Sequence, residues 1–310
     1  MKKILLNYYI PVLLGAMLLF ASCGSDDDIH ADLVPPRFDV TDNPSDPVQH
    51  AKYEMYSKYQ TYLITNPEIY DYKFNFQRKN NLRITAPNQD PAFLQKSIER
   101  FNEVFMNVYS EDFKKKYLPY SIILADKILF LGQDEGTPSY DAYEANRFLA
   151  AAGFSQDMDS QSDSLKQAIK GEIHSRFWYD YIGNELNLFS IPEEFEVPSN
   201  DYYSQEVWDL MDSPIGDVTY LLPWEIDVHP LGFISYNHAT TFFDPDPDWG
   251  GWWIEMPSQE VDKRQWLSFV FGTPKAERDR IIDAYPIMKE KYDILRKTFL
   301  AFDIDLDKLP

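Results

Sequence analysis

Three stretches of the chain carry apolar residues at the three- to four-residue spacing of an amphipathic helix. They cover residues 90–108, 160–181 and 273–302. The first opens at Asp90-Pro91, a typical helix start, and its apolar stripe comprises Phe93, Leu94, Ile98, Phe101, Val104, Phe105 and Val108. Pro286 interrupts the third stretch and predicts a kink or short break, because proline removes a backbone donor and crowds the preceding turn.

Other stretches have the pattern of strands. Aromatic residues alternate with polar ones over 70–76, as in a half-buried strand, and residues 81–85 could pair with it. Residues 121–131 are almost continuously apolar, which favours a buried strand, whereas residues 48–65 have a helical pattern. Together these patterns predict an α+β fold in which helices pack on a small mixed sheet.

The N-terminus has the layout of a secretory signal. Lys2 and Lys3 precede the mostly apolar residues 4–21, and small residues lead to Cys23, the one cysteine of the chain. This segment resembles a bacterial lipoprotein signal, with residues 1–22 removed and Cys23 lipidated. The alternative is a membrane-spanning anchor, against which Asn7 and Pro11 interrupt a run that barely reaches the required length.

The residues after Cys23 begin an acidic, proline-rich tether. Asp26, Asp27 and Asp28 resemble the acidic export tag of Bacteroidetes surface lipoproteins, although a solvated tether would have the same composition. We expect a tether over residues 23–47 and one domain over 48–310. The resemblance implies a protein anchored by lipid in the outer membrane and facing the cell exterior.

Charge narrows the range of partners. The chain has a formal net charge of −21, and loss of Lys2 and Lys3 with the signal makes it more negative. Such a field repels nucleic acid and anionic lipid, so no nucleic-acid partner is expected and membrane contact should come from the lipid anchor. A single cysteine also excludes an internal disulfide and, once lipidated, thiol catalysis.

The middle helix carries the candidate chemistry. It opens with Ser160-x-x-Asp163, which is similar to a capping box, and its apolar stripe comprises Leu165, Ile169, Ile173, Phe177 and Tyr181. On its flank, residues 171–175 resemble an eroded H-E-x-x-H segment, in which two histidines one turn apart hold zinc and a glutamate activates water. Glu172 remains as the vestigial catalytic residue, whereas Gly171 and Ser175 occupy the ligand positions.

Further segments extend this resemblance through most of the chain. They are Leu118-Pro119, residues 232–236, residues 253–256 and residues 303–306. Their order and spacing are similar to those of the zinc-binding metallopeptidase lipoproteins of Bacteroidetes, also called substrate import-associated zinc metallohydrolase lipoproteins. The resemblance implies a zincin-like fold. It also implies a lost third ligand, because Gly251-Trp252 replaces an acidic pair while Glu255 is retained.

Without these ligands we expect no bound metal. Catalytic zinc needs about three protein ligands, and neither glycine nor serine at these positions supplies an imidazole. His174 lies one residue from position 175, about 100° round the helix, so we interpret it as a surface or half-buried side chain. The alternative is a rebuilt zinc site in which His174, His229 and His238 converge with Glu172.

Two weaker candidates lie near residue 250. Asp244, Asp246 and Asp248 alternate as in a calcium loop, but Trp249 stands where the turn glycine of that loop is required, which favours a rigid acidic turn. Flat indole faces commonly stack on sugar rings or anchor peptides. We therefore name Trp249 and Trp252 as ligand-binding candidates and expect Trp253, at a motif position, to be buried.

The resemblance implies a role beside a SusC/SusD-type TonB-dependent transporter and its lipoproteins. The first hypothesis is a non-catalytic accessory that binds or presents peptide or glycan for uptake. The alternatives are an active zinc hydrolase with a relocated metal site and a structural subunit of the transporter assembly. No G-x-S-x-G, phosphate loop or dinucleotide fingerprint occurs in the sequence.

Overall fold

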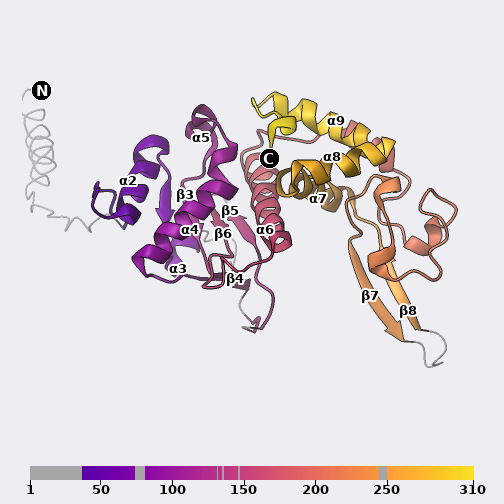
Figure 1. The fold of residues 1–310 in the computed structure, drawn as a ribbon, viewed down its shortest axis with the longest axis horizontal. Helices are drawn as coiled ribbons and strands as arrows, with labels where there is room; N and C mark the ends of the chain where they lie inside the picture. The colour runs from indigo at the N-terminus through magenta and orange to yellow at the C-terminus, as the bar shows by residue number, and fades with distance from the viewer. Residues whose placement is uncertain (1–36, 74–80, 131, 135, 146, 244–249) are drawn as a thin grey trace, which may run out of the picture. The chain divides into compact units, whose positions relative to one another are not determined.

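The structure is a computed structural model. It describes residues 37–73, 81–130, 132–134, 136–145, 147–243 and 250–310, with the backbone alone for 240–243 and 250–252. Residues 40–310 form one compact unit (Figure 1). The predicted signal over 1–22, with Cys23, and most of the tether lie outside the described residues. Within the described part, no helix combines the length and the apolar character needed to cross a membrane.

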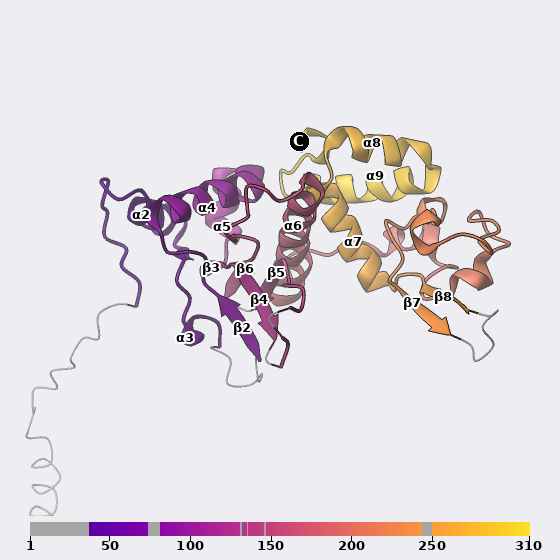
Figure 2. The ribbon, with the colours of Figure 1, turned by 60° about the horizontal axis from the view of Figure 1, so that its bottom comes forward.

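The first half of the unit combines helices with a four-stranded sheet. Its helices are α2 (Pro47–Tyr59), α3 (Ile69–Tyr72), α4 (Pro91–Val104), η1 (Met106–Val108) and α5 (Glu111–Tyr117). Helix α4 begins at Asp90 as predicted, because that carboxylate accepts from the backbone N–H groups of Ala92 and Phe93. Figure 2 shows α2, α4 and α5 together on one side of the strands.

The sheet is mixed. Its order is β1 (Tyr62–Ile64), β3 (Ser121–Leu124), β6 (Phe148–Ala151) and β5 (Ala142–Ala145). The first three strands are parallel, and β5 pairs antiparallel with β6 at the end of the sheet. Every residue of β3 and β6 is buried, as expected for central strands covered on both faces. Helices on a small mixed sheet confirm the predicted α+β class.

Three predicted elements differ in the structure. The helix predicted over 48–65 ends at Tyr59, because Gln60 turns into the left-handed conformation and β1 follows. Residues 69–72 form the helical turn α3 instead of the strand predicted over 70–76, whose last residues lie outside the described part. Strand β2 (Leu82–Thr85) pairs with β4 (Lys127–Phe130), so the described part of the predicted strand, residues 121–130, holds two strands in different sheets.

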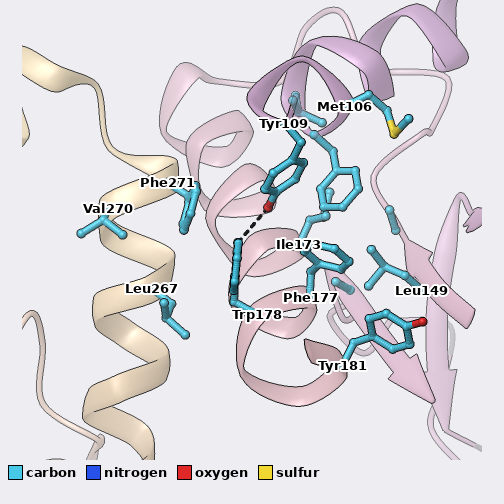
Figure 3. Packing of buried hydrophobic residues seen from close by; sticks show 14 of the residues in the cluster. Met106, Tyr109, Leu149, Ile173, Phe177, Trp178, Tyr181, Leu267, Val270 and Phe271 are labelled. Atoms are coloured by element: carbon cyan, nitrogen blue, oxygen red, sulfur yellow. Dashed lines mark hydrogen bonds between the residues drawn. The ribbon is translucent and has the colours of Figure 1, made fainter. Parts of the chain in front are cut away.

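The middle helix runs through the centre of the unit. It comprises α6 (Asp163–Ser175) and, without a break, the π-helical η2 (Arg176–Glu185). Ser162 caps it by accepting from the backbone N–H of Leu165, so the cap lies two residues after the predicted Ser160. Ile173, Phe177 and Trp178 are fully buried in the main core, which Figure 3 shows between α6 and its neighbours.

The second half holds three long helices and a hairpin. They are α7 (Gln259–Gly272), α8 (Lys275–Ala284), α9 (Pro286–Leu300), β7 (His238–Phe243) and β8 (Gly250–Glu255). Short helical turns complete it: η3 (Glu193–Phe195), η4 (Val197–Ser199), η5 (Val207–Leu210), η6 (Pro223–Glu225), η7 (His229–Leu231) and η8 (Leu306–Lys308). Pro286 starts α9 after an extended Tyr285, which confirms the predicted break. Helix α7 packs along α6 and brings this half to the predicted site.

Candidate functional site

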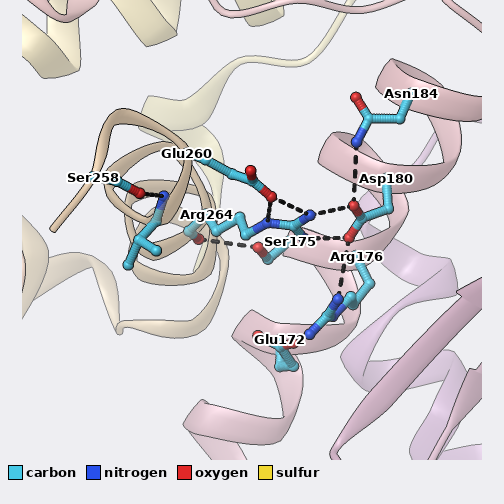
Figure 4. A network of polar contacts seen from close by, with 9 residues as sticks. Glu172, Ser175, Arg176, Asp180, Asn184, Ser258, Glu260 and Arg264 are labelled. Atoms are coloured by element: carbon cyan, nitrogen blue, oxygen red, sulfur yellow. Dashed lines mark hydrogen bonds and ion pairs between the residues drawn. The ribbon is translucent and has the colours of Figure 1, made fainter. Parts of the chain in front are cut away.

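Glu172 belongs to a chain of charged groups along one flank of α6 and η2 (Figure 4). Its Oε1 accepts from Nε of Arg176 at 2.7 Å. Arg176 also reaches Asp180, a side chain only 6% exposed, at 3.5 Å. From α7, Arg264 donates to both oxygens of Asp180. Such a two-pronged contact is the strongest form of an arginine–carboxylate pair, and it joins α7 to the flank that carries Glu172.

Gly171 and Ser175, the two predicted ligand positions, face α7. Ser175 donates from Oγ to the carbonyl of Arg264 at 3.0 Å. A Cβ atom at Gly171 would lie 2.4 Å from Oγ and 2.5 Å from the backbone oxygen of Ser268. Gly272 makes the reciprocal approach, because a Cβ there would lie 2.6 Å from the backbone oxygen of Gln167. Helix α7 therefore fills the space beside Gly171, and glycine permits this close crossing.

A pocket of about 390 Å³ opens between the two helices beside this crossing. Its lining combines a carboxylate, a guanidinium, amides, hydroxyls and a few apolar groups: Ser164, Gln167, Ala168, Glu172, Ile234, Val261, Arg264, Gln265, Ser268, Phe269, Gly272 and Thr273. Glu172 thus borders a cavity large enough for a small ligand segment.

Two carboxyls on the strand side of α6 hold protons more tightly than usual. Burial, with the nearby charge of Glu172, raises the pKa of Asp141 to about 6. Burial, with the charges of Asp180 and Glu185, raises the pKa of Glu144 to about 7. Both lie on or beside β5, which packs against α6 and η2. Near neutral pH a substantial fraction of these carboxyls is protonated, whereas an ordinary surface acid is almost fully ionised.

His174 is a core residue, so its interpretation as a surface or half-buried side chain is wrong. It is fully buried and stacks on Phe271. Its Nδ1 lies 2.6 Å from the hydroxyl of Tyr109, and its Nε2 lies 2.9 Å from the carbonyl of Val104. Burial lowers the pKa of His174 to about 3. Both ring nitrogens are engaged, so neither is available as a ligand.

The other two candidate histidines lie in separate places. His229, in η7, stacks on Tyr285 and contacts Asp227 at 2.5 Å. His238, in β7, lies 3.8 Å from Glu255 in the paired strand. Among the described residues, no three histidine, cysteine or acidic side chains gather in a way that could hold a metal ion.

The remaining candidates lie near the hairpin. Trp253 is 44% exposed, so its predicted burial is wrong. Asp244, Asp246, Asp248 and Trp249 lie outside the described residues, and for Trp252 only the backbone is described. The calcium-loop and indole-stacking predictions therefore stay predictions.

Sequence reasoning missed the contribution of α7. Arg264 and Asp180 are far apart in the chain, and neither belongs to a recognisable motif. Gly171 and Gly272 were the sequence signal for this helix crossing. Glycine is unfavourable inside a helix, so its presence there indicates that a second backbone approaches closely.

No family model and no curated protein matches the chain. Among solved structures, it is similar to a crystal structure from Bacteroides caccae named a "putative zinc-binding metallo-peptidase". The two chains are 15% identical, with 88% of this chain and 92% of the other covered and a TM-score of 0.46. Because this likeness is distant, the functional conclusion depends on the residues of the site itself.

Proposed function

We propose that the protein is a cell-surface lipoprotein with a zincin-like, metallopeptidase-like fold that binds peptide without cleaving it. Gly171 is the observation that carries this proposal. Any side chain there would meet the backbone of Ser268, 2.5 Å from the ideal Cβ position. An imidazole could replace Gly171 only if α7 moved away from α6. Helix α7 therefore occupies the space beside Gly171 that the side chain of a zinc ligand would need.

The pocket beside this crossing supports a binding role. Its amides and hydroxyls can pair with the alternating N–H and C=O groups of a peptide, and Glu172 and Arg264 add a charge of each sign. Sugar sites usually offer a flat, accessible aromatic face. Phe269 is the one aromatic residue of the described lining, and it is buried. These features favour peptide over glycan.

The cellular role follows from the N-terminal segment. Lipidation at Cys23 and the acidic residues behind it would hold the protein on the outer face of the outer membrane. There it would present peptide to a SusC/SusD-type TonB-dependent transporter. Co-purification of that transporter in mild detergent, measured by mass spectrometry of bound proteins, tests the association.

Elemental analysis of natively purified protein tests the missing metal centre. We expect zinc well below one atom per chain. The double variant Gly171→His, Ser175→His restores the motif in sequence, and we expect no gain of zinc because α7 occupies the space. Stoichiometric zinc in the wild type would instead support a hydrolase with a relocated metal site.

Binding is tested with mixed-sequence peptide pools and with glycans by isothermal titration calorimetry. Ala168 is an exposed pocket residue, so Ala168→Trp should block the pocket and reduce peptide affinity at least tenfold. Ala276→Trp, on exposed α8, is the matched control and should bind as the wild type does. Transporter association without any ligand binding would favour the structural-subunit alternative.

A further inference from the structure

A lysine and an aspartate meet inside the second half of the protein. Lys291 of α9 and Asp262 of α7 are both fully buried, and Nζ lies 2.5 Å from Oδ2. Two full charges without water are costly to hold, even when they are paired. The pair lies on the opposite end of α7 from the Gly171 crossing, and nothing in the proposed function uses it.

Aromatic rings enclose the amine. Nζ lies 4.4 Å from the centre of the Phe195 ring and 5.3 Å from that of Phe233. The rings of Trp266 and Tyr203 lie at 5.7 and 5.8 Å. This enclosure keeps water from the amine, so the neutral form of each partner is less disfavoured than it would be at a surface.

The polar contacts around the pair are unequal. Tyr203 donates from its hydroxyl to Oδ2 of Asp262 at 2.7 Å, and Ser199 Oγ lies 3.3 Å from Nζ. Oδ1 of Asp262 is buried and has no hydrogen-bond partner among the described residues. Burial raises the pKa of Asp262 and lowers that of Lys291, against the attraction between the two groups. Both shifts lower the cost of moving one proton within the pair, along the hydrogen bond from Nζ to Oδ2, to give an amine and a carboxylic acid.

We propose that Lys291 and Asp262 condense into an isopeptide bond that joins α9 to α7. After the proton transfer, the neutral Nζ attacks Cγ of the protonated carboxyl. The new N–Cγ bond forms, Oδ2 leaves as water with the transferred proton and a second proton from Nζ, and Oδ1 becomes the amide oxygen. No oxidant, reductant or other reactant is needed.

The contacts assign a role to each neighbour. The Tyr203 hydroxyl donates to Oδ2, the departing oxygen, and so assists the loss of water. Ser199 holds the amine close to the carboxyl. Oδ1, which has no hydrogen-bond partner among the described residues, becomes the amide oxygen. The product is a neutral amide, so the reaction removes both buried charges and ties two helices together covalently.

Peptide mapping of the full, natively purified chain tests the bond. Cleavage after glutamate releases residues 261–277 with Asp262 and residues 291–310 with Lys291 as separate peptides. We expect a single branched species whose mass is about 18 Da below that of the two peptides together. Fragmentation should place the link between Asp262 and Lys291.

Two unlinked peptides at full mass in the wild type would overturn the proposal, and this result does not depend on any variant. A loss of about 18 Da confined to residues 261–277 would also overturn it, because it would indicate an internal succinimide. Lys291→Arg should give separate peptides. The partly exposed pair of Lys263 and Glu196 serves as an internal control and should stay unlinked.

Discussion

At the scale of single residues, four polar groups in the main core are linked by hydrogen bonds: Trp178, Tyr109, His174 and the carbonyl of Val104. Trp178 donates from Nε1 to the hydroxyl oxygen of Tyr109 at 2.9 Å. The carbonyl of Val104 can only accept, so Nε2 of His174 carries the proton and Nδ1 accepts from Tyr109. Every donor among these four groups has an acceptor, so a neutral histidine can be buried there.

This hydrogen-bond network predicts that the protein becomes less stable in acid. The folded pKa of His174 is about 3, below its ordinary value of 6.5, so the unfolded state binds an extra proton between these values. The contribution of neutral His174 to the free energy of unfolding is therefore fully present above pH 6.5 and is lost as the pH falls toward 3. We expect this histidine to cost about 2 kcal/mol of unfolding free energy between pH 7.5 and pH 5.

Urea unfolding at the two pH values measures this effect. The drop should be about 2 kcal/mol smaller in His174→Gln than in the wild type. His238→Gln changes an exposed histidine and controls for the loss of one imidazole. An equal drop in the wild type and His174→Gln would show that His174 does not titrate as a buried neutral group.

At the scale of elements, the α6–α7 crossing depends on small residues. In an exposed helix, Gly→Ala stabilises by about 1 kcal/mol. At Gly171 the added methyl would overlap the backbone of Ser268, so we expect Gly171→Ala to destabilise the protein by about 2 kcal/mol. Thermal or urea unfolding measures the change. Gly136→Ala adds its methyl to open space and is the control; a stabilised Gly171→Ala protein would refute the close crossing.

Glu144, in strand β5, should make the protein less stable as the pH rises, which is opposite to the effect of His174. The folded pKa of Glu144 is about 7, above its ordinary 4.5, so the carboxyl favours folding below pH 4.5, and this contribution is lost as the pH rises through 7. Relative to the wild type, Glu144→Gln should gain about 3 kcal/mol of stability between pH 4.5 and 8. Urea unfolding across that range measures the gain. Glu103→Gln, at a side chain 66% exposed, should show none.

Elements with one apolar face and clear end signals were predictable from the sequence. Asp90-Pro91 and Pro286 mark the starts of α4 and α9. Helix α7 was not predicted from the sequence. Its buried residues include the charged Asp262 as well as several apolar side chains, so its sequence shows no clear division into an apolar and a polar face. The continuous apolar run from 121 to 131 likewise hides the point where the chain passes from one sheet to another.

The candidate site was predictable only in part. The sequence draws attention to residues 171–175, but it does not show that Gly171 and Ser175 face another helix. Arg264 reaches Asp180 across many intervening residues, and no local pattern encodes such a contact. A lysine gives no local sign of burial, yet three-dimensional packing encloses Lys291.

At the scale of the whole molecule, the last residues of the chain belong to the main core. Ile304, Leu306 and Leu309 pack in the same cluster as α6 and α7. A fully buried arginine fastens this segment: Arg278 of α8 donates to the carbonyls of Val270, Leu306 and Leu309. The chain end is thus held by hydrogen bonds as well as by apolar contact.

Replacing that arginine should release the end before it unfolds the rest. Arg278→Met leaves three buried carbonyls without their charged donor, and hydrogen bonds to charged groups contribute about 1.5–3 kcal/mol each. We expect a loss of roughly 4–5 kcal/mol in unfolding free energy and fast hydrogen exchange over residues 303–310. Arg280→Met, two residues along α8 at an exposed position, should change neither quantity. If exchange in Arg278→Met rose equally in all elements, the arginine would support the whole core and not this segment in particular.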